Sequence, residues 1–221
     1  MSYLSCVEIE PSSQAAAAVI WLHGLGANGH DFEPVVPELR LPADSGVRFV
    51  FPHAPAIPVT INGGFVMPAW YDIVDLSIDR KVDVVQLRNS ARQTQALIGR
   101  EIERGIASER IVVAGFSQGG AVAYEAALSY PRPLAGIIAL STYFATEASV
   151  RLDDANQGIP IFIAHGAHDP VVPERLGRAA NEFLSGKGFA TAYKTYPMEH
   201  SVCPAELADI AQWLQATLLD D

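Results

Sequence analysis

One serine in a glycine-rich turn is the residue best placed to do chemistry in this sequence. The segment Gly115-Phe116-Ser117-Gln118-Gly119 follows a short run of strand type, Arg110–Ala114, and precedes an alanine-rich helical pattern, Ala121–Leu128. A strand, a Gly-x-Ser-x-Gly turn and a helix in this order are typical of a nucleophile elbow, in which a strained turn holds the hydroxyl exposed. We therefore predict that Ser117 is a nucleophile. The alternative is an ordinary glycine-rich turn with a passive serine.

Two further residues complete a predicted catalytic triad. A serine hydroxyl needs a base to take its proton and a carboxylate to orient that base. Where such an elbow occurs, the chain order is serine, acid, histidine, each at the end of a strand. Asp169 follows the predicted strand Pro160–Ala164, and His200 follows the predicted strand Thr191–Tyr196. We predict that His200 takes the proton of Ser117 and that Asp169 fixes the tautomer of His200.

Other acids and histidines compete for these roles. His168 is the alternative base, but it adjoins Asp169 in the chain, so the two side chains point in different directions. Asp153 and Asp154 are the alternative acids, in a polar stretch away from any predicted strand end. Asp72 and Asp75 precede the nucleophile and so break the chain order. Among the other histidines, we predict that His23 and His53 hold loop turns, that His30 starts a helix and that His165 flanks the loop of Asp169.

A second glycine-rich loop could stabilise the charge that develops during attack on a carbonyl. It runs from His23 to Gly29 after an apolar strand, Ala17–Leu22. We predict that the backbone N–H groups of Leu25 in this loop and of Gln118 after the nucleophile form an oxyanion hole. The rival interpretation, a phosphate-binding loop, fits poorly because neither Gly-Lys-Ser/Thr nor the dinucleotide glycine pattern is present.

Composition narrows the class of protein. The 221 residues carry a formal charge of −10, which argues against nucleic acid or an anionic membrane as partner. The N-terminus lacks the pattern of a signal peptide, and no apolar run has the length of a membrane span. Cys6 and Cys203 are expected to be reduced thiols, and neither has metal-site spacing. We expect a cytoplasmic protein without cofactor or metal.

The order of elements predicts the scaffold around these residues. Strands alternate with helices, which predicts a mainly parallel sheet covered on both faces. The chain is expected to form one domain, 1–221, without a separate cap. The irregular stretch from Pro52 to about Asp83 is long enough to be functional, and we predict that it forms a wall of the substrate site; the alternative is that it only covers a sheet end. The remaining predicted strands are Tyr3–Glu10, Val47–Phe51 and Leu134–Ser141, and the predicted helices are His30–Leu39, Val84–Arg104, Glu174–Lys187 and Pro204–Leu218.

Taken together, the motifs resemble those of the carboxylesterase and acyl-protein thioesterase family. They span nearly the whole chain: His23-Gly24-Leu25-Gly26, Pro52-His53-Ala54-Pro55, Val59–Gly64, Met67–Asp72 and Gly115–Gly120, with Asp169 and His200. The resemblance implies an α/β-hydrolase with the triad and oxyanion donors named above. It also implies that Trp70 and its neighbours line an apolar acyl groove, and the apolar residues Val66, Met67 and Leu25 are further candidates for acyl contact or for the core.

The resemblance leads to an expected activity. Ala27 stands where the eukaryotic thioesterase branch usually carries aspartate, and the sequence around Asn62 and Trp70 looks more like that of bacterial carboxylesterases. The first expectation is therefore a serine carboxylesterase that acts on small-molecule esters through an acyl-enzyme. The alternatives are an acyl-protein thioesterase or lysophospholipase with the same triad, and a non-catalytic ligand-binding module. A homodimer is possible.

Overall fold

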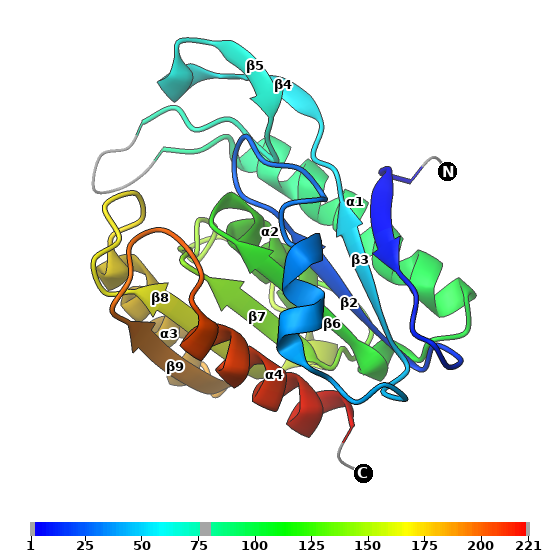
Figure 1. Cartoon of the computed structure of the whole chain (residues 1–221). Coiled ribbons are helices and arrows are strands. Elements are labelled where there is room, and N and C mark those ends of the chain that lie inside the picture. The colour runs from blue at the N-terminus through cyan, green and yellow to red at the C-terminus, as the bar shows by residue number, and fades with distance from the viewer. Residues whose placement is uncertain (1–2, 76–80, 220–221) are drawn as a thin grey trace.

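A twisted seven-stranded sheet forms the centre of the molecule (Figure 1). The computed structural model describes residues 3–75 and 81–219. Only the edge strand β1 is antiparallel, pairing with β3, and all other neighbours in the sheet are parallel. The mainly parallel sheet predicted from the sequence is confirmed. In spatial order the strands are β1 (Cys6–Ile9), β3 (Val47–Pro52), β2 (Ala17–Leu22), β6 (Ile111–Phe116), β7 (Gly136–Leu140), β8 (Pro160–Gly166) and β9 (Ala190–Tyr196).

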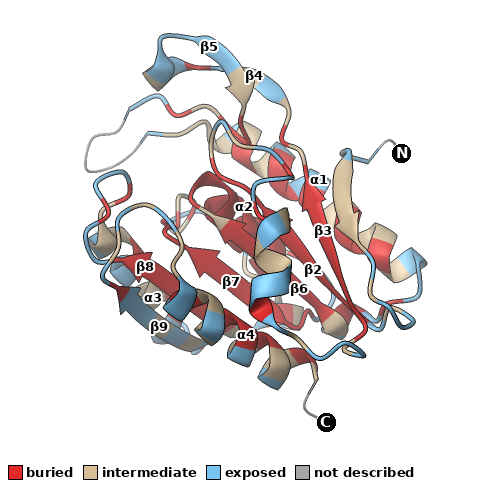
Figure 2. Ribbon diagram, in the orientation of Figure 1, coloured by how far each residue is buried: buried red, intermediate tan, exposed pale blue. Residues whose placement is uncertain are grey.

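The central strands are apolar throughout because both faces of the sheet are covered. All six residues of β2 are buried, and they alternate between two hydrophobic clusters. Ala18, Ile20 and Leu22 face one cluster, while the residues between them face the other. Figure 2 shows the buried strands running through the middle of the molecule, with exposed residues on the outer helices and loops.

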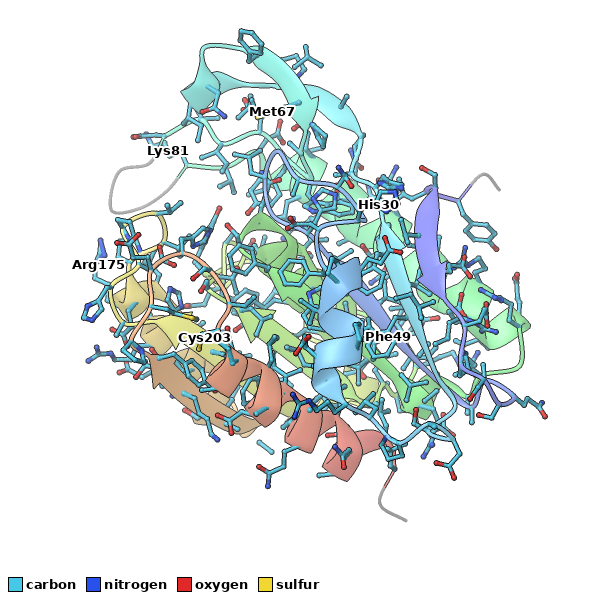
Figure 3. All side chains as sticks on the ribbon, viewed as in Figure 1. His30, Phe49, Met67, Lys81, Arg175 and Cys203 are labelled. Atoms are coloured by element: carbon cyan, nitrogen blue, oxygen red, sulfur yellow. The ribbon has the colours of Figure 1, made fainter. Side chains whose placement is uncertain are left out.

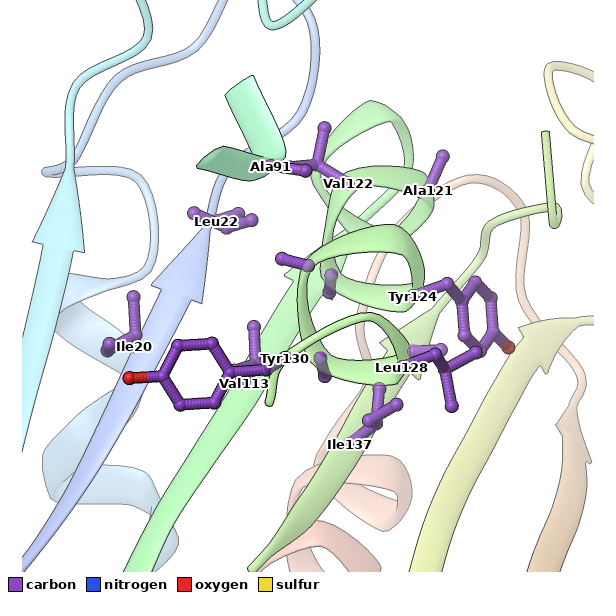
Figure 4. Packing of buried hydrophobic residues seen from close by; sticks show 14 of the residues in the cluster. Ile20, Leu22, Ala91, Val113, Ala121, Val122, Tyr124, Leu128, Tyr130 and Ile137 are labelled. Carbon is purple, nitrogen blue, oxygen red and sulfur yellow. The ribbon is translucent and has the colours of Figure 1, made fainter. Parts of the chain in front are cut away.

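Helices cover both faces of the sheet. Helices α1 (Val84–Glu103), α2 (Gln118–Leu128) and α3 (Glu174–Gly186) contribute to the first cluster. Helix α4 (Pro204–Leu218) and the 3₁₀ helix η1 (Glu33–Leu39) contribute to the second. Every residue of α2 is buried, and Figure 4 shows its side chains packed among those of β2, β6 and β7. The elbow helix is thus held on all sides.

The structure differs from the predicted elements in two places. The segment predicted as a helix over His30–Leu39 is a 3₁₀ helix that begins only at Glu33, and Pro37 inside it lacks the N–H of a regular α-helical bond. The stretch predicted as irregular contains a hairpin of β4 (Ala56–Val59) and β5 (Phe65–Pro68), separated by η2 (Thr60–Asn62). Part of that stretch, residues 76–80, lies outside the described residues.

The hairpin forms because its turn has the glycines that a reversal of the chain requires. Gly63 and Gly64 both adopt positive φ, at 69° and 78°. Their positions let Val59 pair with Phe65, while Gly64 donates a backbone hydrogen bond to Val59. The sequence Asn62-Gly63-Gly64 already carried this turn signal, since Asn-Gly is a frequent hairpin turn.

Candidate active site

Ser117 occupies a strained turn between β6 and α2. Its φ of 54° and ψ of −119° lie outside the regions that a residue with a side chain normally adopts. The turn is tight enough to exclude larger residues on either side. A Cβ on Gly115 would come within 2.4 Å of the Gly119 backbone, and a Cβ on Gly119 within 2.5 Å of the Leu22 carbonyl oxygen. Both glycines of the motif are therefore required by close packing.

The three residues predicted to form a triad come together at the carboxyl ends of three strands. His200 Nε2 lies 3.0 Å from Ser117 Oγ, and His200 Nδ1 lies 2.6 Å from Asp169 Oδ2. Ser117 follows β6, Asp169 follows β8, and His200 follows β9. Because a ring nitrogen faces each partner, the imidazole can accept a proton from the serine while the carboxylate holds the opposite N–H.

The environment of Asp169 keeps its carboxyl ionised. Its other oxygen accepts hydrogen bonds from the backbone N–H groups of Val171 and Val172, both at 2.8 Å. Burial by itself would raise the pKa of Asp169, but the hydrogen bonds from His200 and from these two amides hold the pKa below its ordinary value. The acid is thus present as a charged acceptor next to His200.

His165 holds the loop that carries Asp169, which runs on through Val171 and Val172. Its side chain is fully buried, and its Nε2 donates to the carbonyl oxygen of Val172 at 2.8 Å. Burial lowers the pKa of His165, so the ring is neutral at ordinary pH. This histidine fixes the turn whose amides bind Asp169.

The histidines predicted to hold loop turns do so. His23 is buried, its Nδ1 lies 2.7 Å from the Gly24 carbonyl oxygen, and its Nε2 accepts the N–H of Ala54 at 3.1 Å. His53 Nδ1 accepts the N–H of Gly29 at 3.0 Å. These bonds tie the glycine-rich loop His23–Gly29 to the end of β3.

The rival candidates lie in other roles. His168 is exposed, and the Asp153 carboxylate accepts the N–H of Ala155 at the start of a short 3₁₀ helix, 154–156. Asp72 accepts hydrogen bonds from the backbone N–H and the hydroxyl of Thr60 within the hairpin region. Neither Asp153 nor Asp72 forms a hydrogen bond or ion pair with a histidine in the part of the chain that is described.

The two predicted oxyanion donors are free to bind a ligand. Gln118 is the first residue of α2, so its N–H has no partner in the helix and points with the positive end of the helix dipole. Leu25 lies in the loop His23–Gly29. The residue after it, Gly26, donates its backbone N–H to the Pro68 carbonyl oxygen at 2.8 Å. Across the described residues, neither the Leu25 nor the Gln118 N–H donates to a protein acceptor.

A pocket of about 290 Å³ opens beside Ser117 and His200. Its walls come from the glycine-rich loop His23–Gly29, the stretch after β3 and the loop that carries Asp169. The long stretch after β3 therefore contributes to the pocket, through Ile61 and Ile73. A larger groove of about 590 Å³ lies between η1 and α4, away from the triad. The lining residues of the pocket are Gly24, Leu25, Ala27, Asp31, Ile61, Ile73, Phe116, Ser117, Gln118, Tyr143, Val171, Val172 and His200.

Of the four residues predicted to contact an acyl group, only Leu25 lines this pocket. Trp70 is 1 % exposed and donates its indole N–H to the His23 carbonyl oxygen at 2.8 Å, so it packs behind the pocket wall. Val66 is 62 % exposed on the outer part of the hairpin. Met67 on β5 is half-buried, and its sulfur accepts from Asn62 Nδ2 (Figure 3).

The Gln118 side chain has a structural role that could not be predicted from the sequence. Its Oε1 accepts the N–H of Trp70 and its Nε2 donates to the carbonyl oxygen of Tyr71, both at 2.7 Å. The side chain is 2 % exposed. It therefore bonds the stretch after the hairpin to the residue that follows the nucleophile. Nothing in the spacing of the motif signals such long-range bonds.

Two findings concern possible metal ligands and cysteines in the described parts of the chain. No group of three or more His, Cys, Asp or Glu there is arranged to hold a metal ion. Cys6 and Cys203 are both free, as expected. Within the same residues, no helix combines the length and apolar character of a membrane span.

Comparison with known proteins places these features in context. The model of the phospholipase/carboxylesterase family matches residues 5–218. Acyl-protein thioesterase 1 of Gibberella zeae is 39 % identical over 218 residues, covering 94 % of this chain and 93 % of that protein. The crystal structure of Arabidopsis thaliana SOBER1 is 31 % identical with a TM-score of 0.84, covering 91 % of this chain and 99 % of that one. Zea mays acyl-protein thioesterase 2 is 28 % identical with a TM-score of 0.86, covering 98 % and 100 %.

Proposed function

Because the chain belongs to the phospholipase/carboxylesterase family and has an α/β-hydrolase fold, we propose that it hydrolyses acyl thioesters and esters with Ser117 as nucleophile. One observation supports the proposal above all others: the continuous hydrogen bonds from Ser117 through His200 to Asp169. The name of the relatives, acyl-protein thioesterase 1, supports a thioester as the first candidate substrate. This reverses the order expected from the sequence, in which the carboxylesterase came first.

The geometry supports a two-step mechanism. Ser117 Oγ attacks the acyl carbon while His200 Nε2 takes the hydroxyl proton, and Asp169 stabilises the imidazolium that forms. The carbonyl oxygen becomes an oxyanion and accepts the N–H groups of Leu25 and Gln118. His200 then gives its proton to the departing thiol or alcohol, which leaves an acyl group on Ser117.

The second step repeats the first with water. His200 takes a proton from a water molecule, whose oxygen attacks the acyl carbon of the acyl-enzyme. The same two N–H groups stabilise the second oxyanion. Collapse of this intermediate returns the proton to Ser117 Oγ and releases the carboxylic acid.

The carboxylesterase remains a second candidate because the pocket is small. A volume of about 290 Å³ is at the lower end of the range for ligand pockets, and it favours short or medium acyl groups over long ones. The triad treats the carbonyl of either substrate in the same way. Only the acyl length and the leaving group separate the two candidates.

The deciding experiment compares two peptides of one sequence that carry the same acyl group, on a cysteine sulfur in one and on a serine oxygen in the other. The values of kcat/KM for octanoyl and palmitoyl versions separate thioesterase from esterase and short from long chains. We expect the wild type to hydrolyse the thioester, and Ser117→Ala to lose at least about 10³-fold in activity. Ser185→Ala, at the end of α3 far from the triad, should keep the wild-type activity. Cleavage of the serine ester alone would place the carboxylesterase first.

A labelling experiment tests the remaining alternative, a non-catalytic binding module. A fluorescent fluorophosphonate should modify the wild-type protein and not Ser117→Ala. A folded wild-type protein that takes no label, or equal labelling of both proteins, would rule out Ser117 as the nucleophile.

A further inference from the structure

Asp31 is the one carboxylate among the described residues that line the pocket. Apart from Ser117, His200, Gln118 and Tyr143, the side chains around it are apolar or absent. Asp31 lies in the same loop region as the oxyanion donor Leu25, just before η1. The assigned mechanism gives this residue no role.

The Asp31 carboxylate interacts electrostatically with His23, but burial lowers the pKa of His23, so this neutral ring does not cancel the charge. No Lys, Arg or His in the described parts of the chain forms an ion pair with it, whereas the adjacent His30 pairs with Glu33 at 2.7 Å. Asp31 is exposed at the pocket, and its backbone N–H donates to the Asn28 carbonyl oxygen at 3.0 Å, which fixes the turn that carries it. A bound cation would therefore meet an unpaired charge on a fixed loop.

Asp31 lines the same pocket as His200, the residue that gives its proton to the leaving group. Asp31 is exposed there, whereas the buried or half-buried side chains of Leu25, Ile61 and Ile73 form an apolar part of the wall. The apolar wall suits an acyl chain, which assigns the leaving group to the exposed part of the pocket that carries Asp31. The oxyanion donors and Ser117 fix the acyl carbon beside it.

From these observations we propose that Asp31 forms an anionic subsite for the leaving group, so that esters and thioesters of cationic alcohols or thiols react faster than their neutral isosteres. The inference rests on the proposed hydrolase activity. Apolar walls strengthen the attraction because they exclude water from part of the field. The formal charge of −10 on the whole chain adds a field of the same sign.

The test uses two esters that differ in one atom of the leaving group. Butyrylcholine carries a trimethylammonium group, and 3,3-dimethylbutyl butyrate carries a neutral tert-butyl group of the same shape. For the wild type we expect kcat/KM to favour the choline ester by about fivefold at low salt, as for a partly exposed ion pair. The preference should shrink when salt is raised to about 0.5 M.

Variants assign the preference to this residue. In Asp31→Asn the ratio of the two kcat/KM values should fall by about fivefold, in Asp31→Glu it should be retained, and in Asp31→Lys it should reverse. Asp44→Asn is the matched control, because it removes the same charge from an exposed loop before β3, at the opposite end of the sheet. That variant should keep the wild-type ratio.

Each other outcome overturns part of the argument. If wild type hydrolyses both esters and Asp31→Asn leaves their ratio unchanged, the subsite is wrong while the hydrolase stands. If Asp31→Asn shifts the pH–rate profile of both esters equally, the carboxylate acts on His200 and not on the leaving group, and the subsite is again wrong. If wild type cleaves neither these esters nor the acyl peptides, the proposed function fails and the subsite fails with it.

Discussion

At the scale of single residues, the site depends on side chains that bind their partners on two sides. His200 has Ser117 on one ring nitrogen and Asp169 on the other. Asp169 divides its own two oxygens between His200 and the amides of Val171 and Val172. Each bond therefore orients the next, and a change at Asp169 reaches the nucleophile through the imidazole ring.

Replacing Asp169 by asparagine tests this dependence. The Asp169→Asn side chain can still accept the two backbone bonds through its oxygen, but it presents an amide N–H to His200 and so selects the wrong tautomer. We expect kcat to fall by about 10³- to 10⁴-fold with little change in the far-UV circular dichroism spectrum. Turnover within about tenfold of wild type, measured with a thioester substrate, would show that another acid serves His200.

A buried carboxyl group outside the triad, that of Glu206, lies close to His200 in the chain. Glu206 at the start of α4 is fully buried, and neither of its oxygens has a hydrogen-bond partner at normal distance among the described residues. Burial raises the pKa of Glu206 to about 8, opposed only in part by the backbone N–H of Cys203. The folded protein therefore holds this proton to higher pH than the unfolded chain does.

This difference predicts how stability depends on pH. Between the ordinary glutamate pKa of 4.5 and about 8, the folded state binds more protons than the unfolded state, so the contribution of Glu206 to stability is lost as pH rises. Glu206→Gln keeps the shape and cannot ionise. In urea unfolding at about pH 5 and about pH 9, the variant should gain on wild type by a few kcal/mol at the higher pH.

Glu182→Gln on the exposed surface of α3 is the control for that measurement, since it removes a carboxylate that is not buried. It should follow the wild-type pH dependence. Parallel behaviour of the Glu206→Gln protein and the wild type would mean that Glu206 is ionised in the folded state.

At the scale of elements, the pocket is assembled by joining the loops of separate strands to the elbow helix. The Gln118 side chain bonds the Trp70–Tyr71 backbone, and Thr142 after β7 donates its hydroxyl to the Ser117 carbonyl oxygen at 2.6 Å. The hydroxyl groups of Tyr71 and Tyr143 lie 2.8 Å apart. The segments that line the pocket are thus bonded to the turn that carries the nucleophile.

Removing the Gln118 side chain tests whether these hydrogen bonds hold the pocket wall against the turn that carries Ser117. Gln118→Ala leaves the N–H of Trp70 and the carbonyl oxygen of Tyr71 buried without these partners, and each such loss costs about 1–3 kcal/mol. We expect a lower thermal unfolding midpoint and a higher KM, because the backbone N–H in the oxyanion hole is kept while the pocket wall is loosened. Gln157→Ala, at an exposed position, is the control. Unchanged midpoint and KM would show that the wall is held by its other contacts.

At the scale of the whole molecule, a network of charges joins the antiparallel edge of the sheet to α1. Glu101 is fully buried, and its carboxylate accepts from Arg48 at 2.7 Å and from Arg100 and Arg104 at 3.0 Å. Arg48 and Arg104 also bind Glu10, next to β1. Residues far apart in the chain are therefore fixed around a single carboxylate.

Neutralising that carboxylate should destabilise the fold without affecting the chemistry. In Glu101→Gln the guanidinium of Arg48, itself largely buried, loses its buried counter-charge, and such a loss costs about 3–5 kcal/mol. Urea unfolding should show a lower midpoint, while kcat/KM at about 20 °C stays within about twofold. The exposed Glu38→Gln should change neither. A stability equal to wild type would mean that Glu10 alone compensates the arginines.

Features that depend on local order along the chain could be predicted from the sequence. The alternation of strands and helices, the Gly-x-Ser-x-Gly turn and the positions of Asp169 and His200 after strands were all legible, because strand period, turn geometry and chain order leave local marks. The burial of both sheet faces was visible in the uninterrupted apolar run of β2. The hairpin at Asn62-Gly63-Gly64 was also marked locally, although the prediction treated that stretch as irregular.

Contacts between side chains that lie far apart in the chain could be identified only in the folded molecule. No local pattern indicates that Trp70 packs behind the pocket while Ile61 and Ile73 line it, or that the Gln118 side chain binds a backbone 47 and 48 residues away. The same holds for Asp31, which the fold brings into the pocket that contains Ser117 and His200. Burial and direction are set by the packing of the entire chain, and a residue's type and spacing do not specify them.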